Sequence, residues 1–288
     1  MKYPRLLGLN THNDGVDMWF MARLAPADNL QPEIRAYVDY TERIRTFTCR
    51  RELPHPEGVL IFNLGEDISI TGGDRRQIGL RSGQAFLAGV HLRPALSHSQ
   101  GAQSGVQVEL PLSALRRLFG VPMNRLVDQV LPLEELLGAE AHSLGQRLCD
   151  APGVEARIAV LDAAFIRRLT AAAPLDRRVT GAIHLLRHRF DLDIAEIGFQ
   201  VGWSRKHLAD RIQDAVGVGP RTFRRLLRFQ RLTGELTKGP VRDWTAAALE
   251  AGYCDQSHLI REFREFAGLK PSEFASRMLS HGGGLMEH

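Results

Sequence analysis

The stretch that decides the fold spans residues 244–274 and reads WTAAALEAGYCDQSHLIREFREFAGLKPSEF. Residues 194–223 repeat its pattern. The offset is 50 up to a glycine–aromatic pair and 51 beyond it, because the second copy contains one extra residue, Cys254. The matched pairs are Gly202/Gly252, Trp203/Tyr253, Ser204/Asp255, His207/His258, Leu208/Leu259, Ile212/Phe263, Gly217/Gly268, Pro220/Pro271 and Phe223/Phe274.

Each copy predicts a short helix, a glycine turn and a second helix that begins after a capping residue, Ser204 or Asp255. A glycine after the first helix tolerates the left-handed backbone of a sharp turn, and the cap starts the second helix at once. This is the layout of a helix-turn-helix, whose second helix can enter the major groove of DNA. The side chains expected in the core are Leu208, Ile212, Leu259 and Phe263.

A long helix is predicted between the two copies, from Pro220 to about Thr237. Proline is favoured in the first turn of a helix. A helix of this length spans ~27 Å at 1.5 Å per residue. With the packed motifs added, the two second helices would lie roughly 34 Å apart, which is one turn of DNA. A plain helical repeat that does not touch DNA is the alternative.

The distribution of charge favours the DNA interpretation. Residues 1–175 hold 19 basic and 19 acidic residues, so the whole net charge of +4 lies in residues 176–288. Between Ser204 and Arg231, eight basic residues are opposed only by Asp210 and Asp214. Such a local excess is typical of a surface that binds polyanions, although a solvated helix face gives the same pattern.

The first half predicts a small sheet or barrel followed by helices. Short apolar or alternating segments between glycine turns are typical of strands, and they occur at residues 59–64, 68–70, 78–80, 85–89 and 106–110. After Pro111 the periodicity becomes helical. We therefore predict an α+β chain. It comprises a mixed β/α domain at residues 1–173, an all-α domain with two helix-turn-helix motifs at 174–280, and a tail at 281–288.

Composition narrows the classes of protein further. No apolar run approaches the ~20 residues that a membrane-spanning helix needs, and the N-terminus lacks a signal-peptide core. We therefore expect a cytoplasmic protein without a membrane partner. Cys49, Cys149 and Cys254 are isolated, without C-x-x-C spacing. They predict free thiols rather than disulfides or a zinc site.

Residues 251–274 closely resemble the signature of the AraC/XylS family of bacterial transcription regulators, and residues 176–280 resemble that family's DNA-binding domain. The first half resembles, more loosely, a sensor-like domain of some members, at residues 51–65 and 112–122. The resemblance implies binding to double-stranded promoter DNA and contact with RNA polymerase. It also implies an N-terminal domain that binds a small effector, forms a homodimer, or both. No cofactor is implied, and the chain could be an activator or a repressor.

The resemblance also assigns roles by position. In the second copy it places Gln256, Ser257 and Arg261 against base edges, where Arg261 could fork onto a guanine. The equivalent residues of the first copy are Lys206, Ala209 and Asp210. The family usually has arginine where Asp210 stands, so the first motif reads a different target or reads bases less. Residues interpreted as phosphate contacts or ion pairs are Arg205, Arg221, Arg224, Arg225 and Arg228; the family also carries a packed arginine on this helix, which could be Arg228.

Catalytic motifs are lacking, because the sequence contains no G-x-x-x-x-G-K, no G-x-G-x-x-G and no nucleophile elbow. His184 and His188 share a helix face without the glutamate of H-E-x-x-H, and His91 and His98 lack the close pair of a cupin metal site. Cys49 precedes two arginines, a weak indication of an activated thiol. We predict a non-enzymatic regulator without a metal. The alternatives are an enzyme, acting on DNA or a small molecule, with an appended helix-turn-helix domain, and a regulator that needs no ligand.

Overall fold

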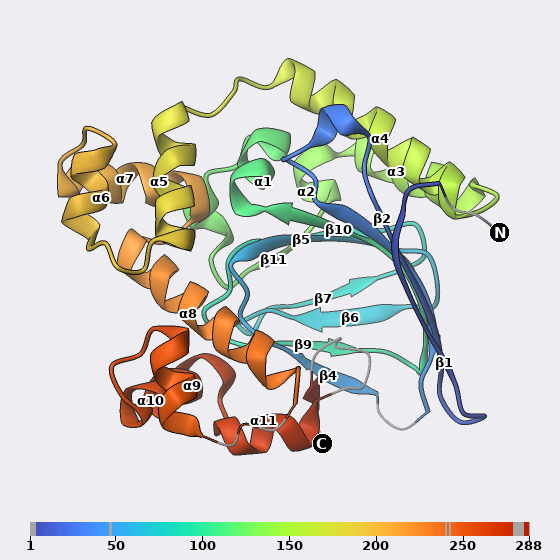
Figure 1. Cartoon of the computed structure of the whole chain (residues 1–288). Coiled ribbons are helices and arrows are strands. Elements are labelled where there is room, and N and C mark those ends of the chain that lie inside the picture. Colours follow the sequence, from blue (N-terminus) through green and yellow to red (C-terminus); the bar gives the residue numbers. More distant parts are fainter. Residues whose placement is uncertain (1–3, 46–47, 240, 242, 279–284, 288) are drawn as a thin grey trace.

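The computed structural model describes residues 4–45, 48–239, 241, 243–278 and 285–287. Its first half is β-rich and its second half is helical (Figure 1). This is the predicted α+β class, with sheet and helices segregated along the chain.

Two sheets make up the β-rich half. The first has seven strands in the order β1-β2-β3-β10-β5-β8-β11, and the second has five in the order β12-β4-β9-β6-β7. Their bounds are β1 Leu6–Asn13, β2 Met18–Leu24, β3 Ala36–Arg43, β4 Cys49–Glu52, β5 Glu57–Asn63, β6 Ile68–Thr71, β7 Gln77–Leu80, β8 Ala85–Ala88, β9 Ala95–His98, β10 Ala102–Pro111, β11 Val130–Pro132 and β12 Leu285–Met286.

Helices account for the rest of the regular structure. Their bounds are α1 Leu112–Phe119, α2 Glu134–Leu137, α3 Ala139–Asp150, α4 Val154–Ala171, α5 Arg177–His188, α6 Ile194–Gln200, α7 Arg205–Val216, α8 Pro220–Leu236, α9 Trp244–Ala251, α10 Gln256–Ala267 and α11 Pro271–Arg277, with short 3-10 turns η1 Asp28–Leu30 and η2 Met123–Leu126. The expected start of α8 at Pro220 is confirmed, and the helix ends one residue before Thr237.

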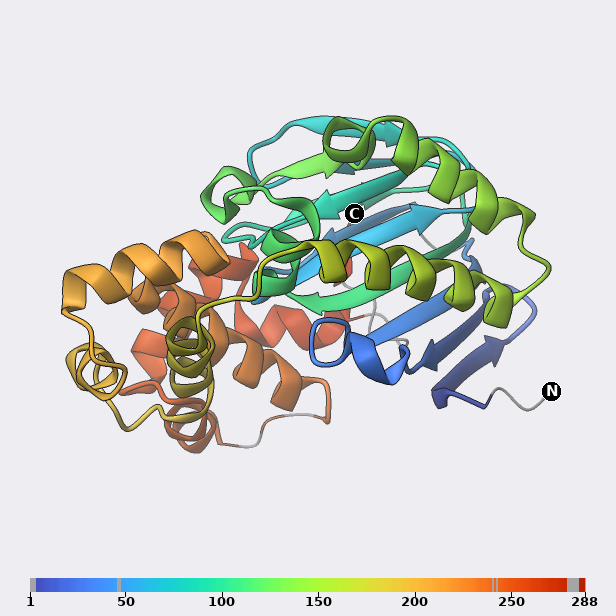
Figure 2. The ribbon, with the colours of Figure 1, turned by 90° about the horizontal axis from the view of Figure 1, so that it is seen from above.

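The strands predicted between residues 57 and 110 are present, but the sheet begins far earlier, at Leu6. Strand β3 shows why the pattern hid these strands. Tyr37 and Asp39 on one face of β3 are both buried under helix α4, where Tyr37 donates a hydrogen bond to Asp162 (2.8 Å) and Arg157 donates one to Asp39 (2.9 Å). A buried acid breaks the apolar alternation that marks a strand in the sequence. Figure 2 shows the helices that cover this side of the sheet.

The two halves share one continuous apolar core. The predicted boundary after residue 173 falls in the loop between α4 and α5, yet the core cluster contains residues of both halves, such as Phe165 and Phe223. Helix α7 ends against the β-rich half: a side-chain carbon on Gly217 would lie 2.7 Å from the backbone oxygen of Met123. The end of the chain returns to the first half as well, since β12 pairs with β4 and so adds a strand within the residues predicted as a tail.

Candidate nucleic-acid interface

The first helix-turn-helix motif consists of α6 and α7, and short-range hydrogen bonds define its turn. The Asp193 side chain accepts from the Glu196 N–H while the Glu196 side chain accepts from the Asp193 N–H, a reciprocal capping box. The hydrogen bond from the Glu196 backbone holds the pKa of Asp193 below its usual value. Gly202 adopts φ 73°, and the Ser204 side chain accepts from the His207 N–H (3.2 Å) to open α7. The glycine and the cap are therefore where the sequence placed them.

The second motif, α9 and α10, has the same construction. Asp243 caps α9, Gly252 adopts φ 89°, and the Asp255 side chain accepts from the His258 N–H (2.7 Å) to open α10. The four residues predicted as core, namely Leu208, Ile212, Leu259 and Phe263, are all fully buried. Each second helix therefore packs one apolar stripe inward and leaves its first turn exposed.

The structural repeat is longer than the sequence comparison found. Arg178 of α5 lies over the Trp203 ring (5.0 Å), and Arg228 of α8, 50 residues later, lies over the Tyr253 ring (5.4 Å). The buried residues of the two helices keep the same offset: Val179, Ala182 and Leu186 match Phe229, Leu232 and Leu236. The repeating unit is thus a module of three helices, α5–α7 and α8–α10. The constant offset was visible in the sequence, but unlike residues at matched positions masked it.

The residues predicted to read bases lie on the exposed starts of α7 and α10. Lys206 and Asp210 are exposed on α7 and Ala209 is half-buried, while Gln256, Ser257 and Arg261 are exposed on α10. Asp210 in α7 occupies the position of Arg261 in α10 at the repeat offset. The two motifs therefore present opposite charges at equivalent points of an otherwise common surface.

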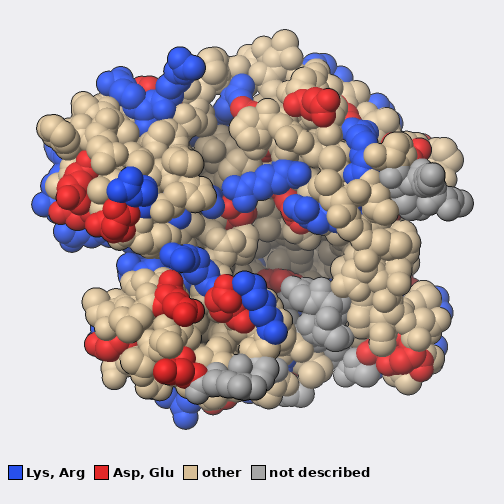
Figure 3. Space-filling view, in the orientation of Figure 1, with Lys and Arg blue, Asp and Glu red and all other residues tan. Residues whose placement is uncertain are grey.

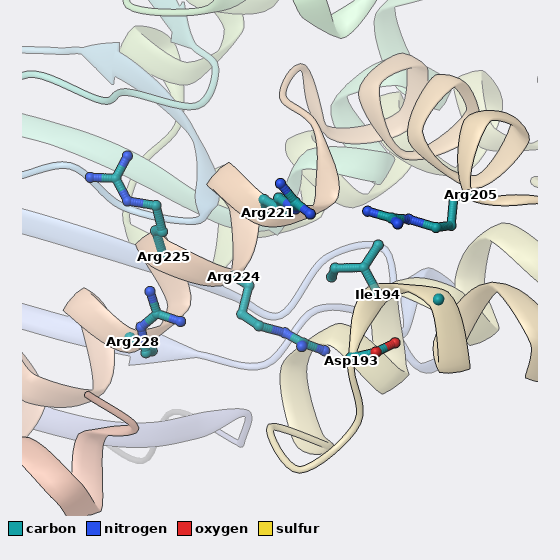
Figure 4. A pocket seen from close by; sticks show the side chains of 8 residues that line it. Asp193, Ile194, Arg205, Arg221, Arg224, Arg225 and Arg228 are labelled. Carbon is teal, nitrogen blue, oxygen red and sulfur yellow. The ribbon is translucent and has the colours of Figure 1, made fainter. Parts of the chain in front are cut away.

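The residues predicted to bind phosphates line one cleft of about 490 Å³ between the start of α6, the start of α7 and one side of α8. Figure 4 shows Arg205 reaching toward the cleft from α7 and the other arginines arranged along α8. The lining residues are Asp193, Ile194, Ala195, Arg205, Arg221, Arg224, Arg225 and Arg228. Five guanidinium groups and one carboxylate make this an anion-attracting concavity.

The five arginines differ in how far their charge is already used. Arg205 and Arg221 are exposed at the rim. Arg224 donates to the backbone oxygen of Leu192 (2.5 Å), and burial, followed by the nearby charge of Arg228, lowers the pKa of Arg224. Arg225 and Arg228 form ion pairs with acids of α10. Two cations are therefore available at the rim, and three are held in place by the protein.

Glu262 of α10 is the acid that ties the second recognition helix to α8. Its side chain is only 3 % exposed and lies 2.7 Å from Arg225 Nε and 3.3 Å from Arg228 Nη2. Arg225 also reaches the exposed Glu265 (2.5 Å), and these two pairs raise the pKa of Arg225 although burial acts to lower it. Burial, followed by the charge of Glu262, raises the pKa of Tyr253. Sequence reasoning missed Glu262, which interrupts the apolar stripe of α10 beside Phe263.

The β-rich half contacts both recognition helices at their far ends. Arg116 of α1 forks onto Asp214 in the last turns of α7, with two hydrogen bonds of 3.0 Å. Arg51 of β4 donates to the backbone oxygen of Ala267, the last residue of α10 (3.3 Å), and pairs with Glu287. Figure 3 shows the hollow that lies between the upper and lower parts of the molecule on this face. The two halves are thus joined through the helices that would read DNA.

The groups considered for catalysis have other surroundings. Cys49 Sγ lies 3.7 Å from His98 Nε2, and burial, followed by the charge of Glu287, raises the pKa of the Cys49 thiol. A raised pKa disfavours the thiolate that a nucleophile needs. His91 is buried, with Nδ1 3.1 Å from the Gly89 backbone oxygen. Within the described ranges, no three histidine, cysteine or acidic residues gather as metal ligands would, and no helix could cross a membrane.

Comparison with known families agrees with this division of the chain. The model of a helix-turn-helix domain matches residues 200–277, and the model of a domain of unknown function (DUF6597) matches residues 22–132. Uncharacterized HTH-type transcriptional regulators of Staphylococcus aureus, from strains MSSA476 and N315 among others, are 29% identical over 84 residues. The match takes in 29% of this chain but spans only 11% of the length of those relatives.

Among solved structures, apo ToxT from Vibrio cholerae is similar over 83% of this chain and 97% of its own, with a TM-score of 0.50 at 13% identity. That likeness concerns the fold, a β-rich half followed by a helical half. The C-terminal part of the chain, which carries the family signature and the paired motifs, is an AraC-type helix-turn-helix domain.

Proposed function

We propose that this chain is a transcription regulator that binds double-stranded promoter DNA in a sequence-specific manner. The observation that carries the proposal is the pair of equivalent three-helix modules, each with the exposed start of a capped second helix, beside a cleft lined by five arginines. Exposed helix starts fit the major groove, and guanidinium groups fit the phosphate backbone between grooves.

In this proposal α7 and α10 enter successive major grooves. Helix α8, with 17 residues, spans about 26 Å at 1.5 Å per residue and acts as a rigid spacer. Gln256, Ser257 and Arg261 read base edges from α10, and Lys206, Ala209 and Asp210 take the corresponding places on α7. Because Asp210 is an acid, it accepts from cytosine N4 where Arg261 donates to guanine.

Arg205 and Arg221 contact phosphates, since they are exposed at the rim of the cleft. Arg224 lies deeper and adds a positive charge behind them. Arg225 and Arg228 serve mainly to hold α10 through Glu262, and they reach phosphate only if α10 moves.

The direct test is selection of binding sites from a random duplex pool with the full chain, followed by salt titration on the best site. We expect enrichment of one motif with two conserved segments about one helical turn apart. Binding without enrichment, or no binding, would contradict sequence-specific regulation.

Removing Arg205 or Arg221 should weaken binding to every sequence alike. Arg205→Ala and Arg221→Ala should each reduce the slope of log Kd against log salt by about 0.9, since one phosphate contact is lost. Lys238→Ala is the matched control, because Lys238 is an exposed cation outside the cleft that pairs with Glu235. An equal loss of slope in all three variants would mean that only net charge matters.

We further infer that the β-rich half adjusts DNA binding by holding the far ends of α7 and α10. Arg116 and Arg51 make these contacts, so a change in the β-rich half can alter the angle or spacing of both helices. A small effector that favours one such arrangement would have to bind the two states with different affinity. The effector, contact with RNA polymerase and homodimer formation are predictions that go with this proposal.

Arg116→Ala should weaken specific DNA binding by the full chain roughly fivefold, a coupling of about 1 kcal/mol. The salt slope should not change, because Arg116 bonds to Asp214 rather than lying in the arginine cleft. The neighbouring Arg117→Ala is the control, since Arg117 pairs with Glu33 within the β-rich half. Exchanging the charges, Arg116→Asp with Asp214→Arg, should restore affinity. Unchanged affinity of Arg116→Ala would refute the coupling.

A further inference from the structure

The hairpin of β1 and β2 carries most of the large apolar side chains that the described residues leave in solvent. Five of the seven lie between residues 6 and 18: Leu6 (38% exposed), Leu7 (53%), Leu9 (54%), Val16 (53%) and Met18 (42%). The remaining two, Phe199 and Leu249, stand alone at equivalent positions of the two helix-turn-helix motifs. Isolated exposed apolar residues are ordinary on protein surfaces, but a cluster marks a surface that contacts a partner.

Strand β1 is also the outer strand of the seven-stranded sheet. Its only neighbour in the sheet order is β2, with regular antiparallel register from Gly8/Arg23 to Asn13/Met18. Every residue of β1 is exposed except His12, which is half-buried, so neither face of the strand is covered. Space is open even at Gly8, where an added Cβ would meet no atom within 4 Å.

Natural edge strands are usually protected against pairing by lysine, proline or inward-pointing charges. β1 has none of these between Leu6 and Asn13, and its register irregularity is confined to residues 6–8. The remaining length therefore presents a flat, uncharged row of backbone donors and acceptors. Such an edge is suited to accept another extended strand.

We propose that β1 pairs antiparallel with β1 of a second copy of this chain, so that the two seven-stranded sheets become one. The contact is isologous, because each strand offers the other the same surface. Leu7 and Leu9 of both copies then lie close to the two-fold axis and cover each other.

Charge at the ends of β1 favours the antiparallel arrangement of two copies. Arg5 comes just before the strand and Asp14 just after it, so an antiparallel pair places each Arg5 near Asp14 of the second copy, whereas a parallel pair sets like charges together. Arg5 remains one-third exposed while it pairs with Asp162. Backbone hydrogen bonds from Asp17 and Val16, together with His12, lower the pKa of Asp14 to about 2, so this end stays negative.

The size of the contact sets its strength. Two paired eight-residue strands bury an area at or below the low end of specific interfaces, about 1,200 Å². A dimer that dissociates in the micromolar range is therefore expected, and it would respond to protein concentration in the cell. β1 lies at the opposite end of the molecule from α6–α10 in both views (Figures 1 and 2). If the proposed function holds, the dimer presents its DNA-reading helices at two far ends, toward separate DNA segments.

Sedimentation velocity of the full chain over a range of concentrations, without DNA, tests the pairing directly. We expect a monomer that becomes a dimer at micromolar concentration. The double variant Leu7→Lys with Leu9→Lys should stay monomeric, because four positive charges would meet near the axis. Leu249→Lys is the matched control, since Leu249 is an equally exposed leucine outside the hairpin, and it should dimerise like the parent chain. A monomer at all concentrations, or a dimer that survives the double variant, would overturn the proposal.

Cross-linking provides a second readout in case the lysine variant misfolds. In a background with Cys49, Cys149 and Cys254 replaced by serine, Leu9→Cys should form a disulfide-linked dimer on mild oxidation. Leu249→Cys should not, and cross-linking of both to the same extent would count against a specific contact. Because neither measurement involves DNA, failure of the pairing leaves the proposed function intact, and failure of the site selection leaves the pairing intact.

Discussion

Glu262→Ala is expected to lower the free energy of unfolding of the chain by about 3–5 kcal/mol, the usual cost of leaving a buried charge without its partner. Glu262 is 3% exposed, and its removal strands Arg228, whose side chain is 16% exposed, and frees half of the contacts of Arg225. Urea unfolding, followed by circular dichroism, measures the loss.

Glu265→Ala is the matched control for this prediction. Glu265 also pairs with Arg225, on the same helix, but its side chain is 57% exposed. An exposed ion pair contributes at most about 1 kcal/mol, so the two glutamates should differ several-fold in their effect. Equal small losses would show that α10 does not depend on the buried pair, and that packing of Phe263 against Phe229 alone holds it.

The second large effect concerns base reading. Arg261→Ala should cost about 1–3 kcal/mol on the selected site and relax the preference at one base pair, because a bidentate contact to guanine is lost. Asp210→Ala, at the equivalent position of α7, should change affinity much less or even tighten binding, since an acid near phosphates is unfavourable. Titration of labelled duplexes that differ at single base pairs measures both effects.

Two outcomes separate base reading from simple charge loss. If Arg261→Ala weakens all duplexes equally, as Lys238→Ala would, Arg261 contacts the backbone and not a base. If Asp210→Ala costs more than Arg261→Ala, the assignment of roles by position is wrong, and α7 rather than α10 dominates recognition.

Local chemistry made the two helix-turn-helix motifs predictable. A capping side chain acts on N–H groups two or three residues away, and a glycine turn needs only its own backbone. The roles of Ser204, Asp255, Gly202 and Gly252 therefore follow from the amino-acid sequence alone. The buried stripes followed from helix periodicity, since Leu208 and Phe263 face inward as the spacing requires.

Strands were predicted less completely for a physical reason as well. A strand is recognised by alternation only when one face is apolar. Asp39 of β3 is buried and paired with Arg157, which lies 118 residues away. β1 is exposed on both faces, so no pattern distinguishes it from a loop. Strand β12 pairs with β4 from the other end of the chain, and that pairing depends on contacts that no local pattern encodes.

The sequence by itself determined the paired motifs, the linking helix and the excess of arginine along it, because caps, turns and periodicity act over a few residues. Only the tertiary structure decided how each arginine is used. Packing brings the acids of α10 against Arg225 and Arg228 and leaves Arg205 and Arg221 at the rim. It also places Arg116 on Asp214, 98 residues apart. Ion pairs between distant segments form only where the folded core sets two side chains within reach, so a single sequence contains the charges without showing their partners.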